Sequence, residues 1–318
     1  MKKSQKIYIS GHKGMVGSAI YRELKNQGFS NILIRERKDL DLMEKSAVFQ
    51  FFKENKPTFV INAAARVGGI YANNTFPAEF IYQNLQIQNN VIHAAHVYGV
   101  EKLLFLGSSC IYPRDCPQPM QESHLMTGHL EPTNDAYAIA KISGIIMCQS
   151  YYRQYGENFL SIMPCNLYGP NDNFDLASSH VLPALIRKFH EAKINQKASV
   201  TLWGTGIAKR EFLHVDDMAN AAVFVMKHIH AKDIYSQNIT HLNVGAGKDI
   251  SIKELAELIS GIIGYKGQIV YDTEKPDGML IKRLDVSRLN QLGWQHRISL
   301  YEGINQTYNW FKQNKDNK

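Results

Sequence analysis

The feature that most constrains the fold is a glycine-rich turn near the start of the chain. The turn reads Gly11-His12-Lys13-Gly14-Met15-Val16-Gly17, follows a short apolar run at residues 6–10, and precedes apolar residues at helical spacing in residues 15–26. Glycine adopts backbone conformations that other residues avoid, and it lets the backbone approach a neighbour closely. A strand, a glycine turn and a helix in this order predict the first unit of a parallel α/β sheet.

Strand and helix patterns keep alternating through the first half of the chain. We expect further strands at residues 31–34, 59–62, 102–106 and 159–163, and helices at 46–54, 85–98 and 136–154. This alternation predicts a doubly wound parallel sheet, the Rossmann architecture. After about residue 170 the pattern loosens. We therefore expect residues 1–170, with later segments at roughly 208–245, to form this domain, and residues 171–318 mainly a smaller substrate-binding lobe.

The glycine turn also predicts a dinucleotide site, because backbone N–H groups and the dipole at a helix N-terminus favour a pyrophosphate. The next strand ends in Ile34-Arg35-Glu36-Arg37-Lys38. An acidic residue at this position usually binds the ribose 2′-hydroxyl of NAD, whereas an arginine accommodates the 2′-phosphate of NADP. Three cations against one carboxylate favour NADP(H), although an ordinary charged loop would have the same composition.

Three residues are suited to carbonyl reduction. Tyr137 and Lys141 lie four apart on a predicted helix and so share one face, while Ser108 follows a predicted strand at the edge where α/β sheets bind ligands. Reduction of a ketone needs an acid that protonates its oxygen. We expect the Lys141 ammonium to lower the pKa of Tyr137, and the Ser108 hydroxyl to orient the carbonyl oxygen. Tyr and Lys at this spacing also occur by chance, so the assignment to carbonyl reduction depends in part on the cofactor site predicted at the glycine turn.

Composition excludes several other classes of protein. The formal net charge is +7, but the basic residues are scattered, which disfavours nucleic-acid binding. No apolar run is long enough to cross a membrane, and the N-terminus lacks the features of a signal peptide. The four cysteines have neither zinc-site spacing nor the density of a disulfide framework. We therefore expect a cytoplasmic protein with reduced thiols, no metal and no membrane contact.

At this point the chain resembles the extended short-chain dehydrogenase/reductases that act on nucleotide sugars. The resemblance continues through Met163-Pro164-Cys165-Asn166-Leu167-Tyr168-Gly169-Pro170, Arg210-Glu211-Phe212-Leu213-His214-Val215-Asp216-Asp217 and Leu242-Asn243-Val244-Gly245, and covers essentially the whole chain. It implies a cofactor site made of Gly11, His12, Lys13, Gly14, Met15, Val16, Gly17, Arg37, Asp41, Leu42, Leu106, Gly107, Ser108, Ser109, Tyr137, Lys141, Pro164, Cys165, Asn166, Leu167 and His180.

Within that branch, four segments resemble the GDP-L-fucose synthases. They are residues 65–70, 108–113, 179–185 and 275–278. The resemblance implies inversion at C3 and C5 of a GDP-4-keto-6-deoxy-mannose, followed by NADPH-dependent reduction at C4. It makes Cys110 the candidate base and His180 the candidate acid, both of which titrate within reach of neutral pH. Without their neighbours, Cys110 would be a small buried hydrophobe and His180 a residue at a helix start.

The remaining implications concern substrate and assembly. The resemblance implies GDP-sugar contacts from Lys188, Trp203, Arg210 and Asp277, and a homodimer formed through residues 85–98 and 136–154. Two departures from the family pattern are Cys165, where a small hydroxylic residue is usual, and the apolar run after Gly278. Two alternatives stay open: another nucleotide-sugar epimerase or reductase of this branch, and an NADP-binding protein that has lost its chemistry.

Overall fold

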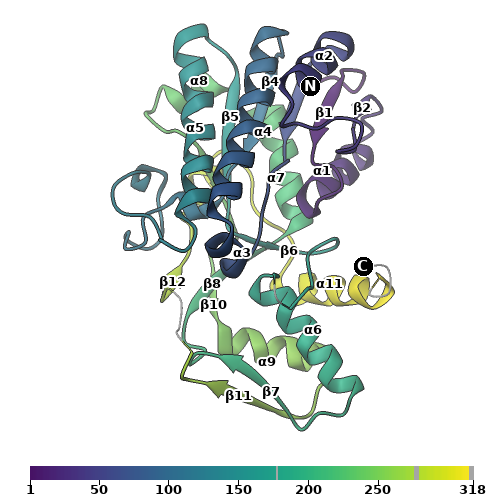
Figure 1. The fold of residues 1–318 in the computed structure, drawn as a ribbon, viewed down its shortest axis with the longest axis vertical. Helices are drawn as coiled ribbons and strands as arrows, with labels where there is room; N and C mark the ends of the chain where they lie inside the picture. The colour runs from purple at the N-terminus through teal and green to yellow at the C-terminus, as the bar shows by residue number, and fades with distance from the viewer. Residues whose placement is uncertain (177, 276–278, 315–318) are drawn as a thin grey trace.

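The computed structural model describes residues 1–176, 178–275 and 279–314, and it has two lobes (Figure 1). The upper lobe is built on a six-stranded sheet whose order is β2-β1-β3-β4-β5-β9, with every neighbouring pair parallel. The strands are β1 (Ile7–Ser10), β2 (Ile32–Leu33), β3 (Phe59–Asn62), β4 (Lys102–Leu106), β5 (Phe159–Pro164) and β9 (Leu242–Val244). The strand order reverses at β1, so the crevice for a ligand is expected beside β1 and β3.

Helices cover both faces of this sheet. On one face, α4 (Pro77–Val97) packs against α5 (Asp135–Tyr155) and α2 (Lys45–Asn55); on the other, α1 (Met15–Asn26) packs against α7 (Val215–His228) (Figure 1). Strands covered on both faces are mostly apolar, and β1, β3, β4 and β5 are buried at every position. The predicted doubly wound α/β fold is confirmed.

The lower lobe is smaller and more mixed. It contains α6 (Val181–Ile194), α9 (Ile252–Ile263) and α11 (Leu300–Asn314) beside a parallel pair of strands, β7 (Ser199–Trp203) and β11 (Gln268–Asp272) (Figure 1). A second small sheet has the order β10 (Asp249–Ser251), β8 (Lys209–His214), β12 (Ile281–Lys282), and β6 (Asn166–Tyr168) also pairs with β8. Through β6 and β8 the chain passes between the lobes.

Buried apolar side chains form two separate clusters that follow this division. One contains the six-stranded sheet and its helices; the other contains α6, α9, α11 and their strands. The split of residues between a cofactor-binding and a substrate-binding lobe remains a prediction, because it concerns ligands.

Several boundaries differ from those expected from sequence. The helix expected at 85–98 begins at Pro77, where a proline suits the first turn because its missing N–H needs no partner there. The short elements α3 (Ile70–Thr75), η1 (Ser109–Ile111), η2 (Glu122–His124), α8 (Ala231–Tyr235) and α10 (Ser287–Gln291), as well as β6, β10 and β12, were not predicted. They are too short for a hydrophobic period to develop. Among the helices described, none is long and apolar enough to cross a membrane.

Candidate functional site

The glycine turn connects β1 to α1 at the carboxyl edge of the sheet. Gly11 has a φ of 74°, and a Cβ at this position would lie 2.8 Å from the backbone of Ala64 in the loop after β3. A Cβ at Gly17 would lie 2.2 Å from the Gly11 carbonyl oxygen. Side chains are therefore excluded from both positions, and the backbone at the N-terminus of α1 is left accessible. This bare turn fits a dinucleotide pyrophosphate.

A polar atom close to the turn also fits a bound ligand. His12 Nδ1 is buried and has no hydrogen-bond partner in the described part of the chain. Burial and the adjacent Lys13 lower the pKa of His12, so the imidazole is neutral at physiological pH.

The tip of β2 presents the charges expected for cofactor selection. Glu36 forms ion pairs with Lys13 (Nζ–Oε1 2.7 Å) and Lys38 (Nζ–Oε2 3.7 Å). Arg37 Nε lies 3.6 Å from Asp41 Oδ2, and its side chain is 75% exposed. The structure thus brings the second-strand residues beside Lys13 of the glycine turn.

The predicted reduction residues meet at the carboxyl end of β4. The Ser108 hydroxyl forms hydrogen bonds with the phenol of Tyr137 and with the thiol of Cys110. Lys141 Nζ donates to the Leu106 carbonyl oxygen at 2.8 Å and lies 5.7 Å from the centre of the Tyr137 ring. These four side chains come from the loop after β4 and from α5, which pack against each other.

The pKa of Tyr137 differs from the sequence expectation. Burial raises the pKa of Tyr137, the nearby Cys110 raises it further, and the Ser108 hydrogen bond only partly opposes this. Burial likewise lowers the pKa of Lys141 to about 8. The expected lowering of the Tyr137 pKa by the ammonium is therefore wrong for this structure: the Lys141 ammonium is held at the Leu106 carbonyl, and desolvation of the phenol dominates. Tyr137 is a protonated phenol at neutral pH, which is the form a proton donor needs.

Cys110 and His180 are both uncharged at neutral pH. Burial raises the pKa of the Cys110 thiol, while Lys282, Ser108 and Lys141 oppose that rise. The His180 side chain reaches solvent, yet protein surrounds it closely enough that burial, helped by Lys282, lowers its pKa. Lys282 thus faces both candidate epimerisation groups.

The candidate substrate contacts are less closely gathered. Burial lowers the pKa of both Lys188 on α6 and Arg210 on β8, and Arg210 Nη1 donates to the Lys209 carbonyl oxygen at 2.8 Å. Arg210 lies opposite Lys282 where β8 pairs with β12, and Lys282 acts electrostatically on Cys110. Trp203 is 71% exposed, with Lys275 Nζ 6.0 Å from its ring centre. Asp277 lies outside the described residues, as do Pro276 and Gly278 of the same segment.

The segment after β5 lies at the junction of the lobes. Cys165 is buried, and its N–H donates to the Val244 carbonyl oxygen at 3.0 Å; Asn166 Nδ2 donates to the Glu211 carbonyl oxygen at 3.0 Å. Cys165 Sγ makes a weak contact of 3.7 Å to the neighbouring carbonyl oxygen of Asn166 and also accepts a hydrogen bond from the Ala246 N–H. The buried thiol stands where the family resemblance predicts a small hydroxylic residue.

Comparison with known proteins decides the family. Residues 7–245 match the sequence profile of the NAD dependent epimerase/dehydratase family, which is more than half of the chain. The chain belongs to this family.

Its relatives within the family match along almost the full length. The chain is 57% identical over 314 residues to the "Putative GDP-L-fucose synthase 2" of Arabidopsis thaliana, covering 99% of this chain and 94% of the relative. It is 54% identical to the "GDP-L-fucose synthase" of Escherichia coli (strain K12), with 98% of each covered. Among solved structures, "MlghC, GDP-mannoheptose C4 reductase from Campylobacter jejuni with NADP bound" has a TM-score of 0.91 at 44% identity. The match covers 98% of this chain and 99% of that one.

Two residues near the site were missed from the sequence. Lys282 is half-buried on β12, and Glu211 is fully buried on β8 next to Arg210. Glu211 stands within the Arg210–Asp217 motif, so its placement there was a signal that could have been used. Lys282 had no comparable signal, because β12 is two residues long and only tertiary structure brings it to Cys110.

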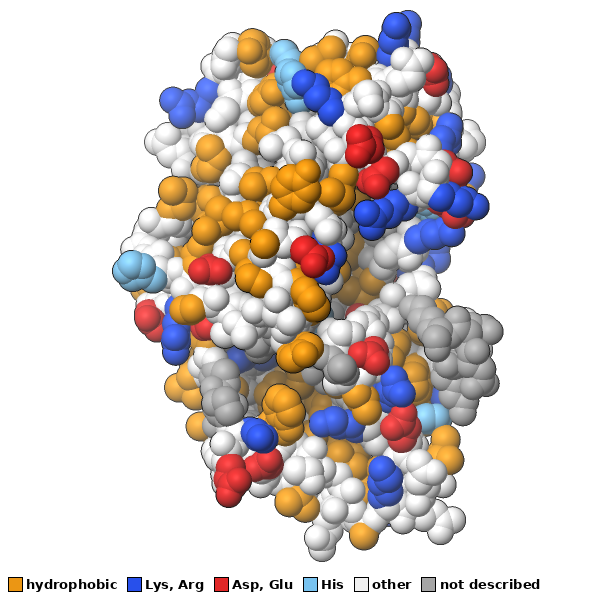
Figure 2. Space-filling view, viewed as in Figure 1, with side chains coloured by type: hydrophobic (Ala, Val, Ile, Leu, Met, Phe, Trp, Pro, Cys, Tyr) orange, Lys and Arg blue, Asp and Glu red, His pale blue; other side chains and the backbone are white. Residues whose placement is uncertain are grey.

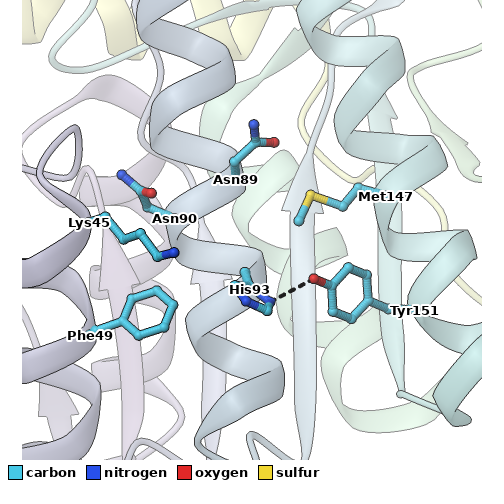
Figure 3. Close-up of a pocket in the computed structure, with 7 residues that line it drawn as sticks. All are labelled: Lys45, Phe49, Asn89, Asn90, His93, Met147 and Tyr151. Atoms are coloured by element: carbon cyan, nitrogen blue, oxygen red, sulfur yellow. Dashed lines mark hydrogen bonds between the residues drawn. The ribbon is translucent and has the colours of Figure 1, made fainter.

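A separate hollow of about 360 Å³ lies away from this chemistry (Figure 3). Its lining comes from α2, α4 and α5, and Tyr151 Oη lies 2.8 Å from His93 Nδ1 across it. Tyr151 follows Tyr137 on α5 by about 21 Å of helix. The hollow is therefore a surface feature between helices, separate from the group of Ser108, Cys110, Tyr137 and Lys141.

Proposed function

We propose that this protein converts GDP-4-keto-6-deoxy-D-mannose to GDP-L-fucose by inverting C3 and C5 and then reducing C4 with NADPH. The observation that carries the proposal is the gathering of four side chains. The Ser108 hydroxyl hydrogen-bonds with Tyr137 and Cys110, and Lys141 Nζ lies 5.7 Å from the centre of the Tyr137 ring. A reductase needs the first three residues, whereas the thiol is an additional acid–base group. Relatives at 57% and 54% identity that are named GDP-L-fucose synthases support the same substrate.

The cofactor residues are those at the glycine turn, the tip of β2, and the ends of β4 and β5. Gly11–Gly17 would hold the pyrophosphate, and Arg37 with Lys13 would face the 2′-phosphate. The nicotinamide end would be lined by Leu106, the last residue of β4, by Gly107, Ser108 and Ser109 after it, and by Pro164, Cys165, Asn166, Leu167 and His180. Asp41 and Leu42 would border the adenosine. When bound, NADPH supplies the hydride for C4.

Reduction depends on how the chain handles one proton. As the C4 oxygen gains negative charge, the Tyr137 phenol protonates it and the Ser108 hydroxyl keeps it aligned. The Lys141 ammonium, fixed at the Leu106 carbonyl oxygen, stabilises the resulting phenolate. The raised pKa of Tyr137 keeps the proton in place until the reaction needs it.

Epimerisation depends on two protons at each centre. The C4 ketone acidifies the hydrogens on C3 and C5, so Cys110 Sγ removes one and the electron pair enters an enolate. His180 then returns a proton to the opposite face, which inverts the centre. In the resting protein both groups are neutral, so transfer of the thiol proton toward the imidazole has to precede the first step. Lys282 beside Cys110 favours the thiolate that this step requires.

The substrate's diphosphate would contact Lys188 and Arg210, since both are cations with partly desolvated side chains. Exposed Trp203 would border the sugar or guanosine end, and Asp277 completes the predicted set.

The test is to incubate the purified protein with GDP-4-keto-6-deoxy-D-mannose and NADPH and to identify the product by NMR. GDP-L-fucose is expected. A C4-reduced product with both centres retained would remove the roles of Cys110 and His180 and favour a C4 reductase, such as the heptose reductase it is similar to. Loss of inversion with retained reduction in Cys110→Ser and His180→Gln variants would support the acid–base assignment; full epimerisation in both would refute it.

The proposal extends to a homodimer. Tyr82, Val97, Ile139 and Ile146 are exposed on α4 and α5, and hydrophobic side chains gather on this face of the upper lobe (Figure 2). Such a face on two adjacent helices suits a second copy of the chain. Light scattering that gave a monomer mass would contradict this.

A cytoplasmic location belongs to the same proposal and is supported by four cysteines that are free thiols.

A further inference from the structure

Glu36 is the one acidic side chain in the sequence Arg35-Glu36-Arg37-Lys38, and it bridges two cations. Its carboxylate lies 2.7 Å from Lys13 Nζ on the glycine turn and 3.7 Å from Lys38 Nζ on its own loop. The lysine side chains are 66% and 76% exposed, against 38% for Glu36. In Figure 2 blue and red side chains gather together at the edge of the upper lobe where Figure 1 labels β2 and α1.

This position has two opposing uses. A carboxylate at the end of the second strand accepts a hydrogen bond from the ribose 2′-hydroxyl of NADH, whereas the cations around it attract the 2′-phosphate of NADPH. The Lys13 ammonium cannot form a full ion pair with both the Glu36 carboxylate and a phosphate dianion at the same time. The hydrogen bond from Lys13 holds the pKa of Glu36 below its usual range, so the competing group is an anion at neutral pH.

The same competition applies to Arg37, because its Nε lies 3.6 Å from Asp41 Oδ2. Lys13, Lys38 and Arg37 therefore each lie beside a carboxylate. A 2′-phosphate that enters must share these cations with Glu36 and Asp41, and the like charges at short distance oppose its binding.

We propose that Glu36 is a specificity-determining residue that weakens 2′-phosphate binding by holding Lys13 and Lys38, and that it thereby limits the preference for NADPH over NADH. The carboxylate keeps a hydrogen-bond acceptor ready for a 2′-hydroxyl while the two ammonium groups remain only partly available to a 2′-phosphate. The site accordingly accepts both forms of the adenosine ribose, with a smaller difference in affinity than its cations alone would produce.

The experiment compares two adenosine probes by isothermal titration calorimetry at one fixed ionic strength. 2′,5′-ADP carries the 2′-phosphate, and 5′-AMP has a 2′-hydroxyl in its place. In Glu36→Gln the dissociation constant for 2′,5′-ADP is expected to fall by about five- to tenfold, because both lysines are released. The constant for 5′-AMP is expected to stay the same or rise. Since the assay contains neither the GDP-sugar substrate nor a hydride donor, the result stands even if the proposed substrate is wrong.

Asp39→Asn is the matched control, because Asp39 is an exposed acid in the same loop and its loss changes the net charge equally. It is expected to change the ratio of the two constants by less than about twofold. An equal gain in Asp39→Asn and Glu36→Gln would overturn the proposal in favour of a general charge effect. Weaker or unchanged 2′,5′-ADP binding in Glu36→Gln would also overturn it, because Glu36 would then orient the lysines or have no influence.

A Lys13→Gln background supplies the second measurement. If Glu36 acts by holding Lys13, the gain from Glu36→Gln must shrink in that background, leaving only the part that comes from Lys38. A full gain without Lys13 would contradict the mechanism.

Discussion

Glu211 allows one prediction to be worked from the structure in detail. Its carboxylate is wholly buried where the lobes meet and accepts hydrogen bonds from the backbone N–H groups of Gly247 and Leu284, both at 2.7 Å. A Cβ at Gly245 would lie 2.2 Å from Glu211 Oε1, so the carboxylate fills the space left by that glycine. Burial nevertheless raises the pKa of Glu211 from 4.5 to about 7.

This pKa fixes the sign of a stability effect. Between pH 4.5 and about 7 the folded state binds more protons at this group than the unfolded state does, so the free energy of unfolding falls as the pH rises. The contribution is fully present below pH 4.5 and is lost as the pH rises through about 7. At about 1.4 kcal/mol for each tenfold change in proton affinity, the loss amounts to about 3 kcal/mol.

Glu211→Gln removes the titration, and glutamine has the shape of the protonated acid. As the pH rises from 4.5 to 8, the free energy of unfolding of the variant should therefore increase by about 3 kcal/mol relative to that of the wild type. For a chain of this length the entropy of unfolding is roughly 0.7 kcal/mol/K, so the difference in Tm should shift by about 5 °C in favour of the variant. Differential scanning calorimetry at several pH values measures it.

The control is Glu254→Gln at an exposed helix cap. Hydrogen bonds from the Ser251 hydroxyl and backbone N–H lower the pKa of the Glu254 carboxyl. The wild type should therefore gain stability over this variant as the pH rises to about 4.5 and stay level above it, the opposite direction to Glu211. If the Tm difference between Glu211→Gln and the wild type did not change with pH, or moved in the direction of the control, the backbone N–H groups would outweigh burial. The reasoning about Glu211 would then be refuted.

Three further outcomes are expected. Tyr137→Phe should lower kcat for C4 reduction by about 10²- to 10⁴-fold while NADPH binding, followed by fluorescence titration, stays intact; unchanged kcat would remove Tyr137 as the proton donor. Arg37→Ala should raise the KM for NADPH by about tenfold and leave the KM for NADH unchanged; an unaltered ratio would exclude Arg37 from cofactor selection. Lys102→Met should destabilise the protein by about 2 kcal/mol in urea unfolding, because Lys102 Nζ donates to carbonyl oxygens at the end of α7. Burial lowers the Lys102 pKa from 10.5 to about 8, so the stability lost in Lys102→Met should increase as the pH rises from about 8 to 10.5. A loss of stability that did not change with pH would contradict the burial argument.

Local sequence was enough to predict the sheet and the grouping of Ser108, Tyr137 and Lys141 at one edge of it. Apolar runs between glycine turns and helical periods give a strand–helix alternation, and parallel strands then put every strand end on the same edge. The sequence therefore predicts that Ser108 after β4 lies close to Tyr137 and Lys141 on α5. The cluster of basic side chains at the tip of β2 could also be predicted, since it depends on only a few adjacent residues.

Other features depended on the environment that distant segments create. Lys282 reaches Cys110 only because β12 pairs with β8, and no periodicity marks a two-residue strand. The pKa of Tyr137 was expected to be lowered by its helical neighbour, but burial in the surrounding fold raises it while the Lys141 ammonium donates to the Leu106 carbonyl oxygen. Likewise the lysine-bridging role of Glu36 comes from the approach of the glycine turn to the tip of β2. Sequence thus determined which groups lie at the site, because spacing along the chain is local information. Tertiary structure decided their protonation and partners, because burial and charge act through space.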